Sequence, residues 1–181
     1  MGHKNIEILL ECLAKNGVCQ TGQRYLNGTR KDIATLAKVW RGWPEYLYEH
    51  SAFALAMFRK YLDNEDKLYL AKEFLFLDFS GTIELGNITP VFFTGNSKIT
   101  LTMSEFATAK IYVFNNSEIT INCNKNAFLN IEIFDDSTLN IIGGENGKCV
   151  VYQYDNSTIE GVAKVVHKIY MRGKVFNGRE L

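Results

Sequence analysis

A short motif that recurs at one fixed spacing constrains the fold of this chain more than any other feature. Four segments, 95–99, 115–119, 135–139 and 155–159, each contain two turn-forming residues, a serine, a variable residue and an aliphatic residue. Their serines are Ser97, Ser117, Ser137 and Ser157, so the step is 20 residues three times in succession. A fixed period of this length predicts a solenoid, in which each repeat buries its apolar face only by stacking on its neighbours.

Apolar and polar residues alternate between these motifs. Ala109, Ile111 and Val113 occupy every second position, and Ile119 and Ile121 resume the alternation after the 115–117 turn. A period of two predicts strands rather than helices, and therefore a parallel β-solenoid with 20-residue coils spaced about 4.8 Å apart. Like residues should stack on like in its interior, in the ladders Ile111/Ile131/Val151, Ile119/Leu139/Ile159 and Ala127/Gly147.

The turn residues allow two interpretations. In the first, a row of Asn and Asp oxygens along one edge holds calcium or binds a sugar. In the second, these residues are present because they tolerate the left-handed turn conformation and can hydrogen-bond between coils. We favour the second, structural interpretation. The serines are likewise expected to bond local backbone rather than to act as nucleophiles. A predicted Phe114/Phe134/Tyr154 stack is interpreted as packing, with a ligand platform as the alternative.

The first part of the chain has helical spacing instead. Ile6, Leu9, Leu10 and Leu13 form an apolar stripe that ends at Asn16, and a second short helix is expected to end at residues 27–28. A third helix should begin with a capping box of Thr29 and Asp32 and end near Gly42. Pro44 should open a fourth helix, and Ser51 should cap a further apolar segment that stops at residues 63–64.

The fold class predicted is therefore α+β, with a small N-terminal helical bundle (1–72) capping a C-terminal parallel β-solenoid (73–181). Strands over 74–79 and 82–85 should form a first coil with a shorter spacing, and the regular coils should run from about 91 to 163. Covering the open end of the solenoid is the role expected of the helices, because a bare first coil exposes unpaired backbone groups and apolar core.

Composition limits the classes of partner. Twenty basic and twenty acidic residues give a formal net charge of zero, which argues against strong electrostatic binding to nucleic acid or to an anionic membrane. We find neither a signal-peptide pattern nor an apolar run long enough to span a bilayer, so the expected location is the cytoplasm, with a phage particle as an open alternative. The four cysteines, Cys12, Cys19, Cys123 and Cys149, lack paired spacing and are expected to be free thiols.

We find no catalytic constellation in the sequence, and expect neither a cofactor nor a metal. His3, His50 and His167 lie in three separate segments without neighbours that suggest a triad or a metal site. Glycan-active β-helices use acidic clusters on one exposed sheet, whereas the outward acidic positions here are only Glu118, Glu132 and Glu160. We therefore expect that the chain is not an enzyme.

Two regions are candidates for contact with a protein. The first combines aromatic residues and an arginine at a helix–helix turn, a composition typical of interface hot spots: Trp40, Arg41, Trp43, Tyr46 and Tyr48. The alternative is that these aromatic residues belong to the core. The second is a basic edge on the last strands, which could instead be charges that protect an exposed sheet edge from aggregation: Lys164, Lys168, Arg172 and Lys174.

The repeats resemble those of uncharacterised β-solenoid proteins of gut bacteria and their phages. The resemblance is clearest in residues 154–160, Tyr-Asp-Asn-Ser-Thr-Ile-Glu, and the segment 14–22 is similar to the short helical head that often precedes such repeats. It implies a fold and a habitat but carries over no catalytic residue. Pentapeptide-repeat solenoids share the 20-residue coil, yet their period of five is missing here.

Two functions from different classes follow from this pattern. In the first, the chain is a non-enzymatic protein-binding module, as a phage or mobile-element factor that modulates a host protein complex. In the second, it is a structural subunit that self-associates through the solenoid ends. A carbohydrate-binding or carbohydrate-cleaving β-helix is a weaker third alternative.

Overall fold

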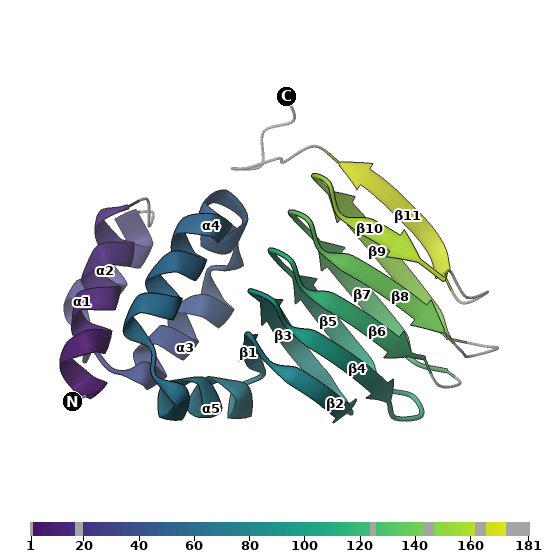
Figure 1. The fold of residues 1–181 in the computed structure, drawn as a ribbon, viewed down its shortest axis with the longest axis horizontal. Helices are drawn as coiled ribbons and strands as arrows, with labels where there is room; N and C mark the ends of the chain where they lie inside the picture. The colour runs from purple at the N-terminus through teal and green to yellow at the C-terminus, as the bar shows by residue number, and fades with distance from the viewer. Residues whose placement is uncertain (1, 17–19, 124–125, 143–146, 162–165, 173–181) are drawn as a thin grey trace. The chain divides into compact units, whose positions relative to one another are not determined.

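The computed structural model describes residues 2–16, 20–123, 126–142, 147–161 and 166–172, and forms two compact units. Residues 1–75 make a helical unit and residues 76–181 a β unit, each of which is described by itself. The helical unit contains α1 (Gly2–Lys15), α2 (Gln20–Gly28), α3 (Ile33–Gly42), α4 (Pro44–Tyr61) and α5 (Asn64–Lys72) (Figure 1).

In the described part of the chain, eleven short strands follow the helices. They are β1 (Leu75–Leu77), β2 (Ser80–Leu85), β3 (Ile88–Thr94), β4 (Lys98–Met103), β5 (Thr108–Val113), β6 (Glu118–Asn122), β7 (Phe128–Ile133), β8 (Thr138–Ile142), β9 (Lys148–Tyr154), β10 (Thr158–Glu160) and β11 (Val166–Arg172). Odd-numbered strands form one sheet in the order β1-β3-β5-β7-β9-β11, and even-numbered strands form the other in the order β10-β8-β6-β4-β2 (Figure 1).

Successive strands therefore alternate between two facing sheets, which is a parallel β-solenoid with two strands in each coil. Lys98 pairs with Glu118, Glu118 with Thr138, and Thr138 with Thr158, so the register step is the 20 residues of the sequence motif. The predicted ladders Ile111/Ile131/Val151 and Ile119/Leu139/Ile159 are paired as expected. The predicted fold class, a helical region followed by a parallel solenoid with 20-residue coils, is confirmed.

The first and last coils depart from this register. Ser80 pairs with Lys98, a step of 18 residues, which confirms the shorter spacing predicted for the first coil. At the other end the motif stops at Gly161, whose φ of +56° is the left-handed conformation. A Cβ added there would lie 2.1 Å from Asn140 Oδ1, so a larger residue would have to displace the Asn140 side chain and adopt a strained φ.

The solenoid interior is closely filled by aliphatic and aromatic side chains. Inward positions of the strands, such as Leu101, Ile121, Ile141 and Val151, are completely buried. Cys123 and Cys149 are buried free thiols in the same interior, and burial raises the pKa of Cys149 to about 12. These cysteines therefore behave as small apolar residues, as predicted. Cys19 lies outside the described residues.

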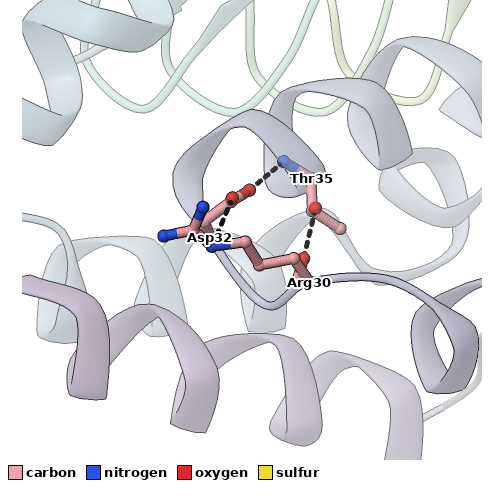
Figure 2. Close-up of polar contacts among 3 residues, drawn as sticks. All are labelled: Arg30, Asp32 and Thr35. Carbon is pink, nitrogen blue, oxygen red and sulfur yellow. Dashed lines mark hydrogen bonds and ion pairs between the residues drawn. The ribbon is translucent and has the colours of Figure 1, made fainter.

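The third helix begins one turn later than its predicted cap. Asp32, not Thr29, is the N-cap of α3, because its side chain accepts a hydrogen bond of 2.9 Å from the Thr35 backbone N–H (Figure 2). The Thr35 hydroxyl donates to the Arg30 carbonyl oxygen, and Arg30 Nε lies 3.4 Å from Asp32 Oδ2. Thr29 instead donates to the Tyr25 carbonyl oxygen, so it closes the end of α2. The predicted Thr29–Asp32 capping box is wrong.

Pro44 is the first residue of α4, as predicted. The new start predicted at Ser51 is also present, because α4 comprises two helices joined across a kink at His50, whose φ of −133° and ψ of 30° are non-helical. The helix α5 was not predicted. Asp63, taken from the sequence as a stop, caps it through a capping box with Asp66.

Candidate functional site

Trp40 belongs to the core of the helical unit. Its side chain is 3% exposed, and its ring stacks on Phe58 with 4.5 Å between the ring centres. The spacing of apolar residues along α3 explains this, because Leu36, Val39 and Trp40 share the face that the helix buries. This is the core alternative considered from the sequence.

The other members of the predicted Trp40–Tyr48 patch are half-buried. Arg41 forms an ion pair of 3.4 Å with Glu73, and the Trp43 ring lies 5.1 Å from that of Tyr25. Tyr46 packs against the His50 ring, and burial followed by the nearby Cys12 raises the pKa of its hydroxyl to about 12. Tyr48 is also half-buried. The rings of Trp40, Trp43 and Tyr46 therefore pack against other helical residues, and the patch is not one exposed surface.

Little of the predicted basic edge falls in the described part of the chain. Lys164 and Lys174 lie outside it. Lys168 and Arg172 lie on β11, where their backbones pair with Val150 and Tyr154 of β9. The structure describes only the backbone of this strand, so the basic edge stays a prediction.

The Asn/Asp row forms a hydrogen-bonded ladder along one edge of the solenoid. Asn115 Oδ1 accepts from the Gly95 N–H at 3.1 Å, and Asp135 Oδ2 accepts from the Asn115 N–H at 2.9 Å. Asp155 Oδ2 accepts from the Asp135 N–H at 3.2 Å. Asn115, Asp135 and Asp155 also have φ values of 60°, 56° and 55°. The oxygens of this row serve backbone amides, which confirms the structural interpretation of the turns.

The serine row is buried beside that ladder. Ser97, Ser117, Ser137 and Ser157 are at most 3% exposed. Ser97 Oγ donates to the Thr94 carbonyl oxygen at 2.8 Å, and Ser157 Oγ donates to that of Tyr154 at 2.6 Å. Because all four side chains are buried, and the hydroxyls of Ser97 and Ser157 bond the turn, these serines are unsuited to attack a substrate.

The predicted aromatic column is present and closely packed. Phe114 stacks on Phe134 at 4.8 Å, and Phe134 stacks on Tyr154 at 4.4 Å, with the rings nearly parallel. Phe114 and Phe134 are only 1% and 2% exposed. Packing is therefore the role of these two rings, and they offer no open platform to a ligand.

The three outward glutamates do not gather on one face. Glu118 and Glu160 lie on the even-numbered sheet and Glu132 on the odd-numbered sheet. Glu118 pairs with Lys98 at 2.9 Å, and Glu132 pairs with Lys110 at 3.1 Å. These three glutamates therefore do not form the pair of facing carboxylates that glycoside cleavage uses.

The Lys110–Glu132 pair is the more enclosed of these two ion pairs. The side chain of Glu132 is 14% exposed, and Lys110 Nζ lies 4.7 Å from the centre of the Tyr112 ring. Burial alone would lower the pKa of Lys110, but the Tyr112 hydroxyl and the Glu132 charge outweigh it, so the net shift is upward. Lys110 is therefore held as a cation, which is unsuited to the role of a general base.

The helical unit contains a groove of about 490 Å³ beside α1 and α2. Leu10 and Leu26 line it, and so do Glu11 and Lys31, which form an ion pair of 2.9 Å. The pKa of Glu11 is lowered, first by the hydrogen bond from Lys31 and then by the charge of that lysine. The groove is therefore of mixed character, and two of its charged groups already pair with each other.

The opposite edge of the solenoid carries apolar side chains that the sequence analysis did not single out. Phe106 is 65% exposed, Phe128 is 44% exposed and Ile142 is 42% exposed. Phe106 lies between β4 and β5, Phe128 is the first residue of β7, and Ile142 is the last residue of β8. The ends of β4, β6 and β8 and the starts of β5, β7 and β9 follow one another along a single edge in Figure 1. Within the described residues of the β unit, they are the exposed large apolar side chains. We call Phe106, Phe128 and Ile142 the apolar edge.

Phe106 occupies a strained backbone position on this edge. Its φ of +58° is the left-handed conformation, which is unusual for a bulky residue. One coil later the same position is Asn126, with φ of +66°. Aligning the repeats one under another would have revealed this exception, because Phe106 stands where the next coil has an asparagine, which suits the turn.

The described residues contain no cluster of three or more His, Cys, Asp or Glu side chains arranged to hold a metal ion. None of their helices has both the length and the apolar character that crossing a membrane requires.

Comparison of the chain with protein-family models, with curated proteins and with solved structures found no match.

Proposed function

We propose that this chain is a non-enzymatic protein-binding module whose solenoid offers the apolar edge as its contact surface. The observation that carries the proposal is the exposure of Phe106, Phe128 and Ile142 on three successive coils. A soluble protein gains stability by burying such side chains, and aromatic residues exposed together are typical of protein contact sites.

Phe106 adds a second argument. A bulky residue in the left-handed conformation costs about 1 kcal/mol, and here that cost is not offset by burial of the ring. An asparagine, which the next coil has at this position as Asn126, would avoid it. A strained and exposed aromatic side chain is therefore more consistent with a role in contact than with a role in folding.

The rest of the proposal rests on the sequence. The resemblance of the repeats to β-solenoid proteins of gut bacteria and their phages is the ground for proposing a phage or mobile-element factor. In this role the module acts in the bacterial cytoplasm and modulates a host protein complex. The helical unit is proposed to cover the open end of the solenoid, where unpaired strands would otherwise be exposed.

Site-specific photo-crosslinking tests the contact surface. A photoreactive phenylalanine analogue is placed at Phe128 or Phe106, and as a matched control at Asn116, which is exposed on the Asn/Asp edge. We expect protein adducts from positions 128 and 106 and few from position 116, with circular dichroism confirming that all three variants fold. Equal yields from the two edges, or none from either, would contradict the proposal.

Self-association through the solenoid ends is the second candidate function. It is favoured by the strand order, since β10 and β2 end one sheet and therefore each have one strand neighbour in the described part of that sheet. An unpaired strand edge is a template for a strand from another chain. Alteration of β10 should then weaken self-association, and a protein that stays monomeric at high concentration would contradict this candidate.

A further inference from the structure

The groove beside α1 and α2 has the size of a small-molecule site. Its volume of about 490 Å³ lies within the range of about 300–1,000 Å³ that is usual for ligand pockets. Leu10 and Ala14 of α1 and Leu26 of α2 line it. These three side chains give the groove an apolar part, against which a hydrocarbon group can pack.

The charged side chains of the groove carry one surplus positive charge. Among the described residues that line it, Lys15 and Lys31 are the cations and Glu11 is the anion. Lys31 donates one hydrogen bond of 2.9 Å to Glu11, which leaves two N–H donors on its ammonium group. The hydrogen bond from Lys31, the charge of Lys31 and, more weakly, the charge of Lys15 lower the pKa of Glu11, so both lysines lie near this carboxylate.

The neighbouring charges leave this balance unchanged. Residues 17–19, between α1 and α2, are glycine, valine and cysteine, none of which adds a fixed charge. Glu7 lies one turn before Glu11 and Arg24 follows Gln23; both lie outside the lining, and they have opposite signs. The groove therefore favours an anion over a cation.

Two carboxamides add hydrogen-bonding groups to this surface. Gln23 Nε2 donates to the Ala14 carbonyl oxygen at 3.4 Å and thereby connects α2 with α1. Asn27 lines the groove one turn further along α2. A carboxamide both donates and accepts hydrogen bonds, so it can serve either oxygen of a bound acid group.

We propose that this groove binds a small organic monocarboxylate, with its carboxylate held by Lys15 and Lys31 and its hydrocarbon part against the apolar lining. A monoanion balances the surplus of one charge, whereas a phosphate monoester carries nearly two negative charges at neutral pH. Arginine, whose planar fork suits phosphate, is absent from the described lining. This site belongs to the helical unit and is independent of the apolar edge.

Nuclear magnetic resonance titration of the full chain with hexanoate tests the inference. The matched probes are 1-hexanol and hexylamine, which have the same hydrocarbon part with a neutral or a cationic head. We expect hexanoate to shift the amide signals of the groove residues with a Kd of about 1 mM, and the other two probes to bind about tenfold more weakly. Salt should weaken hexanoate binding, because its charge pairs are exposed to solvent.

The two members of the Glu11–Lys31 ion pair should respond in opposite directions. Lys31→Met removes a cation and should weaken hexanoate binding about fivefold, whereas Glu11→Gln removes the competing carboxylate and should strengthen it about fivefold. If the pair only supported the fold, both replacements would act in the same direction. Lys98→Met is the matched control, because it breaks an ion pair that is also 2.9 Å long but lies in the β unit, and it should leave hexanoate binding unchanged.

Three results would each overturn the inference: the absence of saturable shifts with hexanoate up to about 10 mM, equal binding of 1-hexanol, or weaker binding by folded Glu11→Gln. Thermal unfolding shows whether each variant folds. Should Lys31→Met fail to fold, Lys15→Met repeats the test at an exposed position, and unchanged affinity in that variant would also contradict the site.

Discussion

Asp135 Oδ2 lies 2.9 Å from the backbone nitrogen of Asn115 and accepts its hydrogen, although the two residues are one coil apart in the chain. Asn115 itself accepts from Gly95 of the preceding coil, so one set of side chains both tolerates the turn and joins successive coils. The turn chemistry and the stacking of this solenoid are thus provided by the same residues.

Asp135→Ala should destabilise the solenoid. It removes the acceptor for the Asn115 N–H and places alanine at a φ of +56°, with an expected loss of about 2 kcal/mol in the free energy of unfolding. Asp135→Asn keeps an acceptor and the tolerance for this turn, and should lose less than half as much. Hydrogen exchange of the Asn115 amide measures the effect directly, and unchanged protection in the alanine variant would contradict the ladder.

Phe106→Asn should stabilise the protein while it removes an exposed aromatic contact. Asparagine suits the left-handed turn, as Asn126 does one coil later, so we expect a gain of about 0.5–1 kcal/mol in the free energy of unfolding. Urea unfolding measures it, with Phe128→Thr as the control at a position without positive φ. A loss of stability on Phe106→Asn would show that the ring contributes to folding and would remove one argument for a binding role.

Replacement by alanine should affect stability differently at two glycines. Gly161 has a φ of +56° and a side-chain position occupied by Asn140, so Gly161→Ala should cost more than about 1 kcal/mol. The Cβ of Gly86→Ala meets nothing within 4 Å, and this variant should be neutral or slightly stabilising. Thermal unfolding of the two variants compares them, and equal midpoints would contradict the close approach at Gly161.

The stability of the solenoid should fall at alkaline pH because of Cys149. Burial raises the pKa of this thiol in the folded state to about 12, from its ordinary value of 9.0. Above pH 9 the unfolded chain releases the proton while the folded chain keeps it, so the free energy of unfolding decreases by about 1.4 kcal/mol per pH unit up to about pH 12. Cys149→Ala should remove this part of the pH dependence in urea unfolding at successive pH values, and an unchanged slope would contradict the assignment.

Trp40 and Trp43 should differ in how much they contribute to the stability of the helical unit. Trp40→Ala leaves a cavity beside Phe58 in the helical core, with an expected loss of about 3–5 kcal/mol in the free energy of unfolding. Trp43 is half-buried against Tyr25, so Trp43→Ala should cost clearly less. Chemical unfolding followed by tryptophan fluorescence measures both, and similar losses would show that Trp43 is as deeply packed as Trp40.

The repeat made most of the β unit predictable. A spacing of 20 residues fixes which residue stacks on which, and the pairing of Ile111 with Ile131 follows from it without any knowledge of the coordinates. Asn115 and Asp135 were also predictable, since their chemistry suits a left-handed turn.

The helical unit was harder to predict, because single residues there determine where each helix begins and ends. Asp32 and Thr29 are both good cap residues, and only the bond to the Thr35 N–H decides between them. Asp63 was read as a stop, although Asp66 three residues later marks a start. The exposure of Phe106 does not follow from its residue type, because the side of a turn on which an apolar residue lies is set by the coil as a whole.

The direction of the Asn/Asp ladder has a consequence for how the chain is made. In the chain of bonds from Gly95 to Asn115, Asp135 and Asp155, each turn amide is satisfied by a side chain that comes 20 residues later. A ribosome that adds 5–20 residues per second delivers that side chain about 1–4 s after the amide it serves. Each coil of the nascent protein therefore lacks this hydrogen bond to its turn amide until the next coil has been synthesised. The most recently made coil is thus less stable than it will be in the finished protein.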